Sequence, residues 1–330
     1  MTTLTAGVDL GGTNARAALV ASDGTIQRRA QCHTPANDPR PDALVRLVAD
    51  VVADGDLRSV VVGVPGVVDH DTEAVVEAPN LPPGWRPYLT GAWFSQQLGI
   101  PVSLANDADL AAVGESEFGA GRNHRDVVYV TISTGIGAGV VVAGSLVRGR
   151  RSGGEIGHTV IDVTAARLGA PSTVEDLGSG PAIARAAAAA GLFERDAALA
   201  DLVRSGHQQA QTLWNEAMEA VGVGIVNLVW IVAPQIVVIG GGVGRNHDLV
   251  EPVISRVLAE HGPPLAEPIV VASTLLGDDA ALTGAAAWFR AIGRSLETST
   301  STSTSTSTST STSTSTSTST STSTSTSGVS

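Results

Sequence analysis

Three glycine clusters in this sequence, two of which also contain a threonine, are suited to binding phosphate groups. Glycine has no side chain to block a phosphate, so its backbone N–H group can donate to a phosphate oxygen. Asp9, just before the first cluster, could hold Mg²⁺ through water. A tight hairpin would favour the same residues, and that alternative stays open. The clusters are Gly11, Gly12, Thr13 and Asn14, then Thr134, Gly135 and Gly137, and finally Gly240, Gly241 and Gly242.

A pair of polar residues, Asn106 and Asp107, follows the apolar segment PVSLA. The pattern predicts the end of a strand and the start of a helix, where either residue would make a good N-cap. One residue is enough for a cap, and a carboxylate at the carboxyl edge of a sheet can accept a proton from a substrate hydroxyl. Helix capping and general-base chemistry are therefore both open.

A further set of polar side chains lies in and after the glycine-rich segment GGEIGH, which contains Glu155 and His158. Together with Glu175, these side chains could bond sugar hydroxyls, or the segment could be a solvated loop. Three basic residues precede it and are typical of a solvated surface, with steering of an anionic ligand as the alternative. They are Arg148, Arg150 and Arg151.

The composition excludes several kinds of chemistry. The 330 residues include twenty Arg and no Lys, which excludes a Walker A loop, a protein-kinase lysine and a Schiff base. The single cysteine, Cys32, excludes disulfides within the chain and fits a reducing cytoplasm. A formal charge of −12 disfavours a nucleic-acid surface. The motifs G-x-G-x-x-G, G-x-S-x-G and H-E-x-x-H are absent.

Two strand–turn–strand units, each with a glycine hairpin, must position these residues. The first runs through residues 6–33 and the second through residues 125–149, with strand and helix patterns alternating between them. Such a repeat predicts two related α/β domains that face each other across a cleft, although two similar units could also arise by chance. We expect domains at residues 1–113 and 114–284, a terminal helix end at 285–294, and a disordered Ser/Thr tail at 295–330.

The most apolar stretch, residues 220–243, is long enough to raise the question of a membrane span. Asn227, Pro234 and Gln235 interrupt it, so a helix to about Val232 and a buried strand QIVVIG explain it better. We expect no membrane partner. No basic region followed by an apolar region occurs at the start of the chain, and we expect no signal peptide.

The motifs in this order resemble the ROK family of sugar kinases, in the hexokinase and actin-like superfamily. The resemblance runs from about Gly7 to Phe289 and is specific as a set, although each motif is weak alone. It rests on VDLGGTNAR, GVPGVVD, PNLPPGW, LANDADLAAVGE, TGIGAG, GGEIGH, VEDLGSG and VNLVWIVAPQIVVIGGGV. The resemblance implies two actin-like, ribonuclease H-like domains around a cleft, and ATP-dependent phosphorylation of a hexose hydroxyl.

The resemblance also implies roles for individual residues. Asp107 corresponds to the general base, and the three glycine clusters correspond to the ATP site with Mg²⁺. The sugar ligands implied are Gly66, Asn80, Asn106, Asp107, Glu155, His158 and Glu175. Glucose is the leading substrate, with fructose, mannose or an N-acetylated hexosamine as the rivals and a non-catalytic sugar sensor as the rival of another class. A homodimer is expected.

One departure from the family pattern concerns zinc. The family usually has a C-x-C-G-x-x-G-C motif between the histidine of GGEIGH and the following glutamate. Here the interval, residues 159–174, contains no cysteine, so no zinc site is expected and sugar preference is in doubt. Repressors of the family carry a helix-turn-helix domain ahead of the glycine motif. Because Gly7 is the seventh residue of this sequence, we expect no such domain.

Overall fold

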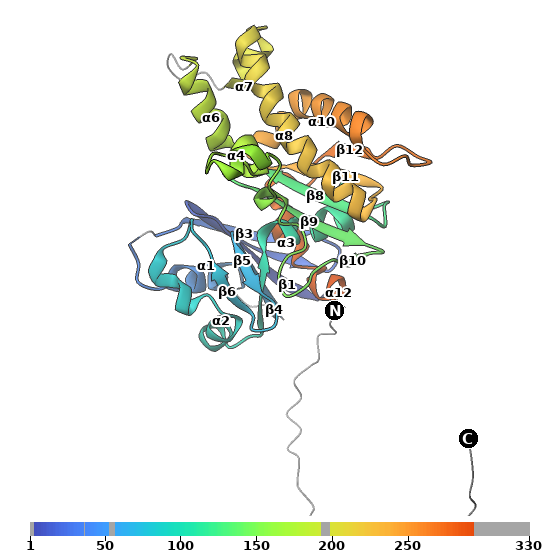
Figure 1. Ribbon diagram of the computed structural model, residues 1–330. Coiled ribbons are helices and arrows are strands. Elements are labelled where there is room, and N and C mark those ends of the chain that lie inside the picture. Colours follow the sequence, from blue (N-terminus) through green and yellow to red (C-terminus); the bar gives the residue numbers. More distant parts are fainter. Residues whose placement is uncertain (1–2, 36, 53–56, 193–198, 294–330) are drawn as a thin grey trace, which may run out of the picture. The chain divides into compact units, whose positions relative to one another are not determined.

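Two five-stranded mixed sheets with the same strand order form the frame of the molecule (Figure 1). In each, a three-stranded antiparallel meander is extended by two parallel strands. The first sheet has the order β3 (Ile26–His33), β2 (Asn14–Ala21), β1 (Leu4–Leu10), β4 (Leu57–Val64) and β7 (Val102–Asn106). The second has the order β10 (Ser145–Leu146), β9 (Ile136–Val142), β8 (Val127–Ile132), β11 (Ile236–Gly240) and β12 (Val270–Ser273). The repeated order confirms the predicted fold class.

The computed structural model describes residues 3–35, 37–52, 57–192 and 199–293, and the predicted Ser/Thr tail lies outside them. The α-helices are α1 (Asp42–Val52), α2 (Gly91–Leu98), α3 (Asp107–Phe118), α4 (Val163–Arg167), α5 (Val174–Gly178), α6 (Gly180–Ala189), α7 (Leu199–Arg204), α8 (Gln208–Val232), α9 (Gly241–Gly244), α10 (His247–His261), α11 (Ala280–Gly284) and α12 (Trp288–Ala291). Short 3₁₀ turns are η1 (Pro83–Tyr88), η2 (Ile156–His158) and η3 (Gly277–Asp279), and β5 (Val67–Asp69) pairs with β6 (Ala74–Glu77).

The segment SVVVGVPGVVD, for which the pattern predicts a strand that ends in a Pro-Gly turn, forms β4 up to Val64, turns at Pro65 and Gly66, and continues as β5. Gly66 has φ of +132°, and a Cβ there would lie 2.1 Å from the carbonyl oxygen of Glu77, so the chain turns where only glycine fits. The pattern of residues 268–292 predicts a strand followed by one helix, and the structure has β12 followed by three short helical pieces, η3, α11 and α12.

The long helix α8 is long and apolar enough to cross a membrane by length and composition alone. In the structure it packs in the core of the second half of the chain, with Trp214, Met218, Ile225 and Val229 buried. It ends at Val232, with Ala233 as the C-cap residue, and the buried strand β11 follows. A core helix of a soluble protein passes the same length test, so α8 is weak evidence for a membrane span.

Two helices, α3 and α11, cross between the two sheets. A Cβ on Gly114 would lie 2.2 Å from the carbonyl oxygen of Ala280, and one on Gly284 would lie 2.0 Å from that of Leu110. The two backbones are therefore in direct contact, which glycine alone allows. Contacts join Met1–Ser295 into one compact unit. The predicted boundary at residues 113 and 114 falls inside α3 and stays a prediction.

Candidate active site

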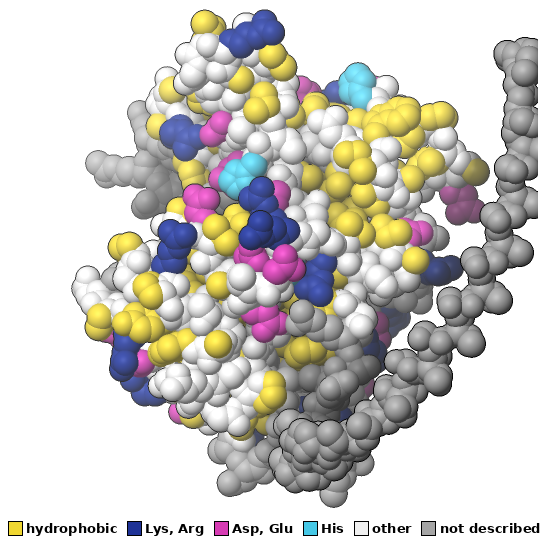
Figure 2. Space-filling model, turned by 60° about the horizontal axis from the view of Figure 1, so that its bottom comes forward, with side chains coloured by type: hydrophobic (Ala, Val, Ile, Leu, Met, Phe, Trp, Pro, Cys, Tyr) yellow, Lys and Arg dark blue, Asp and Glu magenta, His cyan; other side chains and the backbone are white. Residues whose placement is uncertain are grey.

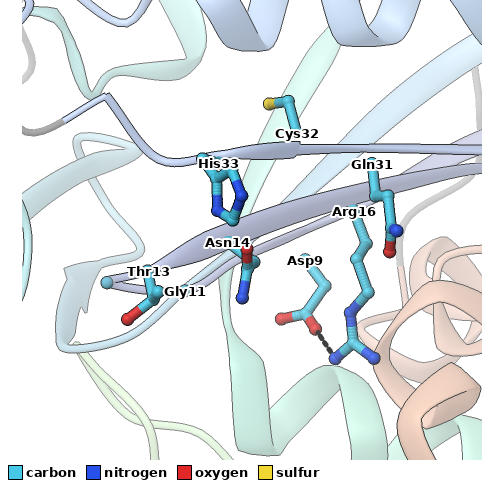
Figure 3. A pocket seen from close by; sticks show the side chains of 9 residues that line it. Asp9, Gly11, Thr13, Asn14, Arg16, Gln31, Cys32 and His33 are labelled. Atoms are coloured by element: carbon cyan, nitrogen blue, oxygen red, sulfur yellow. Dashed lines mark hydrogen bonds and ion pairs between the residues drawn. The ribbon is translucent and has the colours of Figure 1, made fainter.

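A cavity of about 790 Å³ is lined from both halves of the chain, where the strands of the two sheets end. All the predicted site residues line it except Asn14 and Gly240. Gly240 is the last residue of β11, directly before Gly241, which does line the cavity. Asn14 lines an adjoining cavity of about 580 Å³ on the same face of the first sheet (Figure 3).

Asn106 caps helix α3, as one of the two alternatives for this residue predicts. Its side-chain oxygen accepts hydrogen bonds from the backbone N–H groups of Ala108 (2.9 Å) and Asp109 (3.2 Å). Its amide donates to the carbonyl oxygen of Gly66 at 3.0 Å. One N–H of the amide is left for a ligand, because the amide has two. Asn106 thus links the cap of α3 to the β4–β5 turn.

Asp107 is the first residue of α3 and faces the cavity. Burial raises the pKa of its carboxyl to about 7, the charge of Asp9 adds to this effect, and a hydrogen bond from the N–H of Ala108 opposes it. A carboxylate with a pKa near neutrality is suited to accept a proton from a hydroxyl and to release it again. Since Asn106 supplies the cap, capping does not account for Asp107.

The first glycine hairpin lies on the same cavity as Asp107. The N–H of Gly11 donates to the carbonyl oxygen of Asn14, and Thr34 braces the turn through its side chain to the carbonyl oxygen of Gly11 at 2.7 Å. A Cβ on Gly12 would lie 2.7 Å from the carbonyl oxygen of Asn80. The hairpin therefore packs directly against the segment that carries Asn80, which also lines the cavity.

A cation that the sequence analysis missed, Arg16, lies beside this hairpin. Figure 3 shows Arg16 and Asp9 on one face of the sheet with an ion pair between them, and Cys32 pointing to the other face. The pair measures 2.5 Å, from Nη2 of Arg16 to Oδ2 of Asp9. Burial raises the pKa of Asp9, although Arg16 opposes that shift. The register of β1 and β2 could have identified Arg16 from the sequence, because an antiparallel hairpin that turns at Gly11–Thr13 places Arg16 opposite Asp9.

A second group that the sequence analysis missed comes from η3 and from the residue that follows α9. Asp278 forms ion pairs with Arg245 and, at 3.5 Å, with Arg16. All three residues line the cavity, so two guanidinium groups and one carboxylate lie near the glycine clusters. No short motif surrounds Arg245 or Asp278, and only the folded chain brings them to Arg16.

The second glycine hairpin is fixed by Glu175. The N–H of Ile136 donates to Oε2 of Glu175 at 2.8 Å, and a Cβ on Gly135 would lie 2.7 Å from the same oxygen. Glu175 lines the cavity and also holds the hairpin in place. The third cluster follows β11, where Gly241 has φ of +86° and a Cβ would lie 2.5 Å from the carbonyl oxygen of Ile132.

Glu155 directly precedes the 3₁₀ turn η2 and His158 is its last residue. Both line the cavity, with 4.0 Å between Oε2 of Glu155 and Nε2 of His158. Burial raises the pKa of Glu155, and His158 and Arg151 oppose that shift. The preceding segment lies on β9, since Ala138 donates its N–H to Gly154 and a Cβ on Gly154 would lie 1.8 Å from the carbonyl oxygen of Ala138.

Metal binding by protein side chains alone has little support in the described part of the chain. No three His, Cys, Asp or Glu side chains among those residues are grouped as a metal ion would require. Asp9 is a single carboxylate on the cavity, which suits Mg²⁺ carried by phosphates, because Mg²⁺ is usually held by one or two carboxylates and the phosphates of its nucleotide.

Comparison with known proteins gives consistent matches along the chain. The model of the ROK family matches residues 5–292. Glucokinase of Thermotoga maritima is 32% identical over 303 residues, which cover 85% of this chain and 95% of that protein. N-acetylmannosamine kinase of Escherichia fergusonii is 32% identical over 292 residues, covering 87% and 97%. A ROK family glucokinase from Streptomyces griseus, solved with glucose and AMPPNP, matches with a TM-score of 0.71 and 30% identity, covering 87% of this chain and 99% of that one.

Proposed function

The chain belongs to the ROK family, and from that premise we propose that it is an ATP-dependent hexose kinase with glucose as its leading substrate. The reaction moves the γ-phosphoryl group of MgATP to the 6-hydroxyl of the sugar. The observation that carries the proposal is the position of Asp107, a carboxyl with a pKa of about 7 on a cavity that all three glycine clusters reach.

Asp107 acts as the general base. Its carboxylate accepts the proton of the sugar hydroxyl as that oxygen bonds to the γ-phosphorus and the bond from that phosphorus to the β,γ-bridging oxygen of ATP breaks. The sugar is positioned from both sides of the cavity, by Asn80 and Asn106 on one side and by Glu155, His158 and Glu175 on the other. Positioning of this kind supplies a large part of the barrier reduction in phosphoryl transfer.

The phosphates are bound by the backbone N–H groups and hydroxyls of the glycine clusters, with no lysine needed. Arg16 and Arg245 add positive charge beside them. Mg²⁺, when bound with the nucleotide, neutralises charge on the phosphate oxygens. Asp9 would hold it through water, and Figure 3 shows one oxygen of its carboxylate pointing away from Arg16.

The test is a coupled assay of ADP formation with MgATP and a panel of hexoses, followed by identification of the phosphorylated position. We expect turnover with glucose and a product phosphorylated at the 6-hydroxyl. Absence of turnover with every sugar in the panel would contradict the proposal, and would favour a non-catalytic sugar sensor.

The second candidate is a kinase for another sugar, in particular an N-acetylated hexosamine. The observation that favours it is the 32% identity to N-acetylmannosamine kinase of Escherichia fergusonii, equal to that with the Thermotoga maritima glucokinase. The same panel decides between them by the ratio of kcat/KM for N-acetylmannosamine and for glucose.

The location, oligomeric state and partners of the enzyme are part of the same proposal. We place it in the cytoplasm, in carbohydrate metabolism and glycolysis, as a homodimer with no nucleic-acid or membrane partner. The acidic composition disfavours a nucleic-acid partner. In the middle of the face drawn in Figure 2, basic side chains lie beside acidic ones. Size-exclusion chromatography with light scattering tests the dimer.

A further inference from the structure

A buried carboxyl outside the cavity, that of Asp109, joins helix α3 to the segment that leads to Glu155. Asp109 is 0% exposed and lies two residues after Asp107. Its Oδ1 accepts a 2.9 Å hydrogen bond from the hydroxyl of Ser152. Its Oδ2 is buried and has no hydrogen-bond partner among the described residues. Asp109 does not line the cavity, so its role is not direct contact with a ligand.

Ser152 connects Asp109 to Gly154, in the glycine-rich segment GGEIGH, through a second hydrogen bond. Its Oγ, besides donating to Asp109, accepts from the N–H of Gly154 at 3.3 Å. The carbonyl oxygen of Gly154 accepts from Ile156 at 2.7 Å and from Ala138. A chain of hydrogen bonds therefore runs from α3, which carries the general base, to both neighbours of Glu155.

A second attachment of the same segment is exposed. Residues 148–152 form a turn in which Arg148 and Ser152 pair. The carbonyl oxygen of Arg150 accepts from the N–H of His70, and its side chain pairs with Asp69 at 2.9 Å. The side chain of Arg150 is 76% exposed, and exposed ion pairs contribute little. The buried hydrogen bond between Ser152 and Asp109 should therefore hold this segment more strongly than the exposed ion pair does.

We propose that Asp109 is a positioning residue for sugar binding, which acts through Ser152 to hold Glu155 at a fixed place relative to Asp107. This rests on the proposed function, because it takes Glu155 as a sugar ligand. The group acts in its neutral form. Burial raises the pKa of Asp109 to about 8, the charges of Glu155 and Asp107 add to this, and the hydrogen bond from Ser152 and the charge of Arg148 oppose it.

The test compares the sugar KM, the ATP KM and kcat in single variants and one double variant. Asp109→Ala and Ser152→Ala should each raise the sugar KM by about tenfold, the usual effect of losing one buried hydrogen bond, with the ATP KM unchanged. The double variant should be no worse than the worse single one, because both remove the same link. Asp109→Asn keeps an oxygen for Ser152 and should restore the sugar KM to within about threefold of wild type.

Two control variants distinguish a specific rise in the sugar KM from a general effect of removing a polar side chain. Ser205→Ala removes an exposed hydroxyl that donates to Leu202, and Arg150→Ala removes the exposed ion pair; both should leave the sugar KM within about twofold. A sugar KM unchanged in Asp109→Ala and Ser152→Ala, or an Asp109→Asn variant as impaired as Asp109→Ala, would overturn the inference while leaving a working kinase. A wild-type chain without turnover would instead overturn the proposed function, and this inference with it.

Discussion

Arg16 and Asp9 face each other across the first hairpin, joined by a 2.5 Å ion pair, and the other Nη of Arg16 lies 3.5 Å from Asp278. The guanidinium is therefore held between two carboxylates at the place where we propose that phosphates bind. Phosphate oxygens compete well for a guanidinium group, because they accept charge-assisted hydrogen bonds. Nucleotide binding should shift Arg16 from the carboxylates to the phosphates.

Replacement of Arg16 tests this exchange. Arg16→Ala should raise the ATP KM by about 10- to 100-fold, the usual range for a hydrogen bond to a charged group, and should leave sugar affinity nearly unchanged. Arg29→Ala is the matched control, since Arg29 pairs with Asp279 from an exposed position and does not line the cavity. Steady-state kinetics with varied ATP measure both, and an ATP KM equal to wild type in Arg16→Ala would contradict the role.

A pH dependence of stability follows from Asp109. Its folded-state pKa of about 8 lies above the ordinary value of 3.8, so the folded protein holds a proton that the unfolded chain has lost between those values. Stability attributable to Asp109 therefore falls as pH rises from about 4 to about 8. Asp109→Asn carries no titratable group, so its melting temperature should fall less than that of wild type between pH 5 and pH 9. An identical fall in both proteins would contradict the raised pKa.

The crossing of α3 and α11 gives a prediction on stability. A Cβ at Gly114 would meet the backbone of Ala280 at 2.2 Å, and backbone in a helix cannot move aside cheaply. Gly114→Ala should lower the melting temperature by about 3 to 10 °C, as overpacking of a buried contact does. Gly149→Ala is the control, because nothing lies within 4 Å of a Cβ there. Calorimetry that shows equal melting temperatures for the two variants would contradict the close crossing.

Metal content gives a further prediction. The purified protein should hold no stoichiometric zinc, because the interval from Thr159 to Val174 lacks cysteine, and a chelator should not alter its melting temperature. Removal of Mg²⁺ should abolish turnover, since the nucleotide is used with its metal. Elemental analysis that finds one zinc per chain would overturn the first part, and turnover without any divalent cation would overturn the second.

The sequence predicted the sheets well because their signals are local. Alternation and β-branched runs mark the strands, and the repeated hairpins at Gly11 and Gly135 predict the repeated strand order. The Pro-Gly turn after β4 was predicted too, but the close approach of Gly66 to Glu77 was not, because it depends on the pairing of β5 with β6. The final helix was predicted as one element, whereas the structure has three short pieces, with a gap at residues 285–287 between α11 and α12.

The residues that line the cavity also differ in whether the sequence alone can identify them. Glycine clusters and the Asn106–Asp107 pair are recognisable because one short segment carries each chemistry. Arg245 and Asp278 carry no local signal, and only the packing of α9 and η3 brings them to the cavity. The link from Asp109 to Ser152 spans 43 residues and is invisible as a motif.

The pH profile of catalysis should follow Asp107. A general base must be deprotonated, so kcat/KM should fall tenfold per pH unit below about 7, the pKa that burial and Asp9 give this carboxyl. A profile that stays flat from pH 7 down to pH 5 would contradict a base with that pKa.

The central claim, that Asp107 is the base of a hexose kinase, is tested most directly by Asp107→Asn. Asparagine keeps the size of the side chain and leaves the Asn106 cap intact, but it cannot accept the proton. We predict that kcat for glucose phosphorylation falls by about 10² to 10⁴, while calorimetry shows glucose binding within about tenfold of wild type. A variant that keeps a third or more of the wild-type kcat would contradict the account.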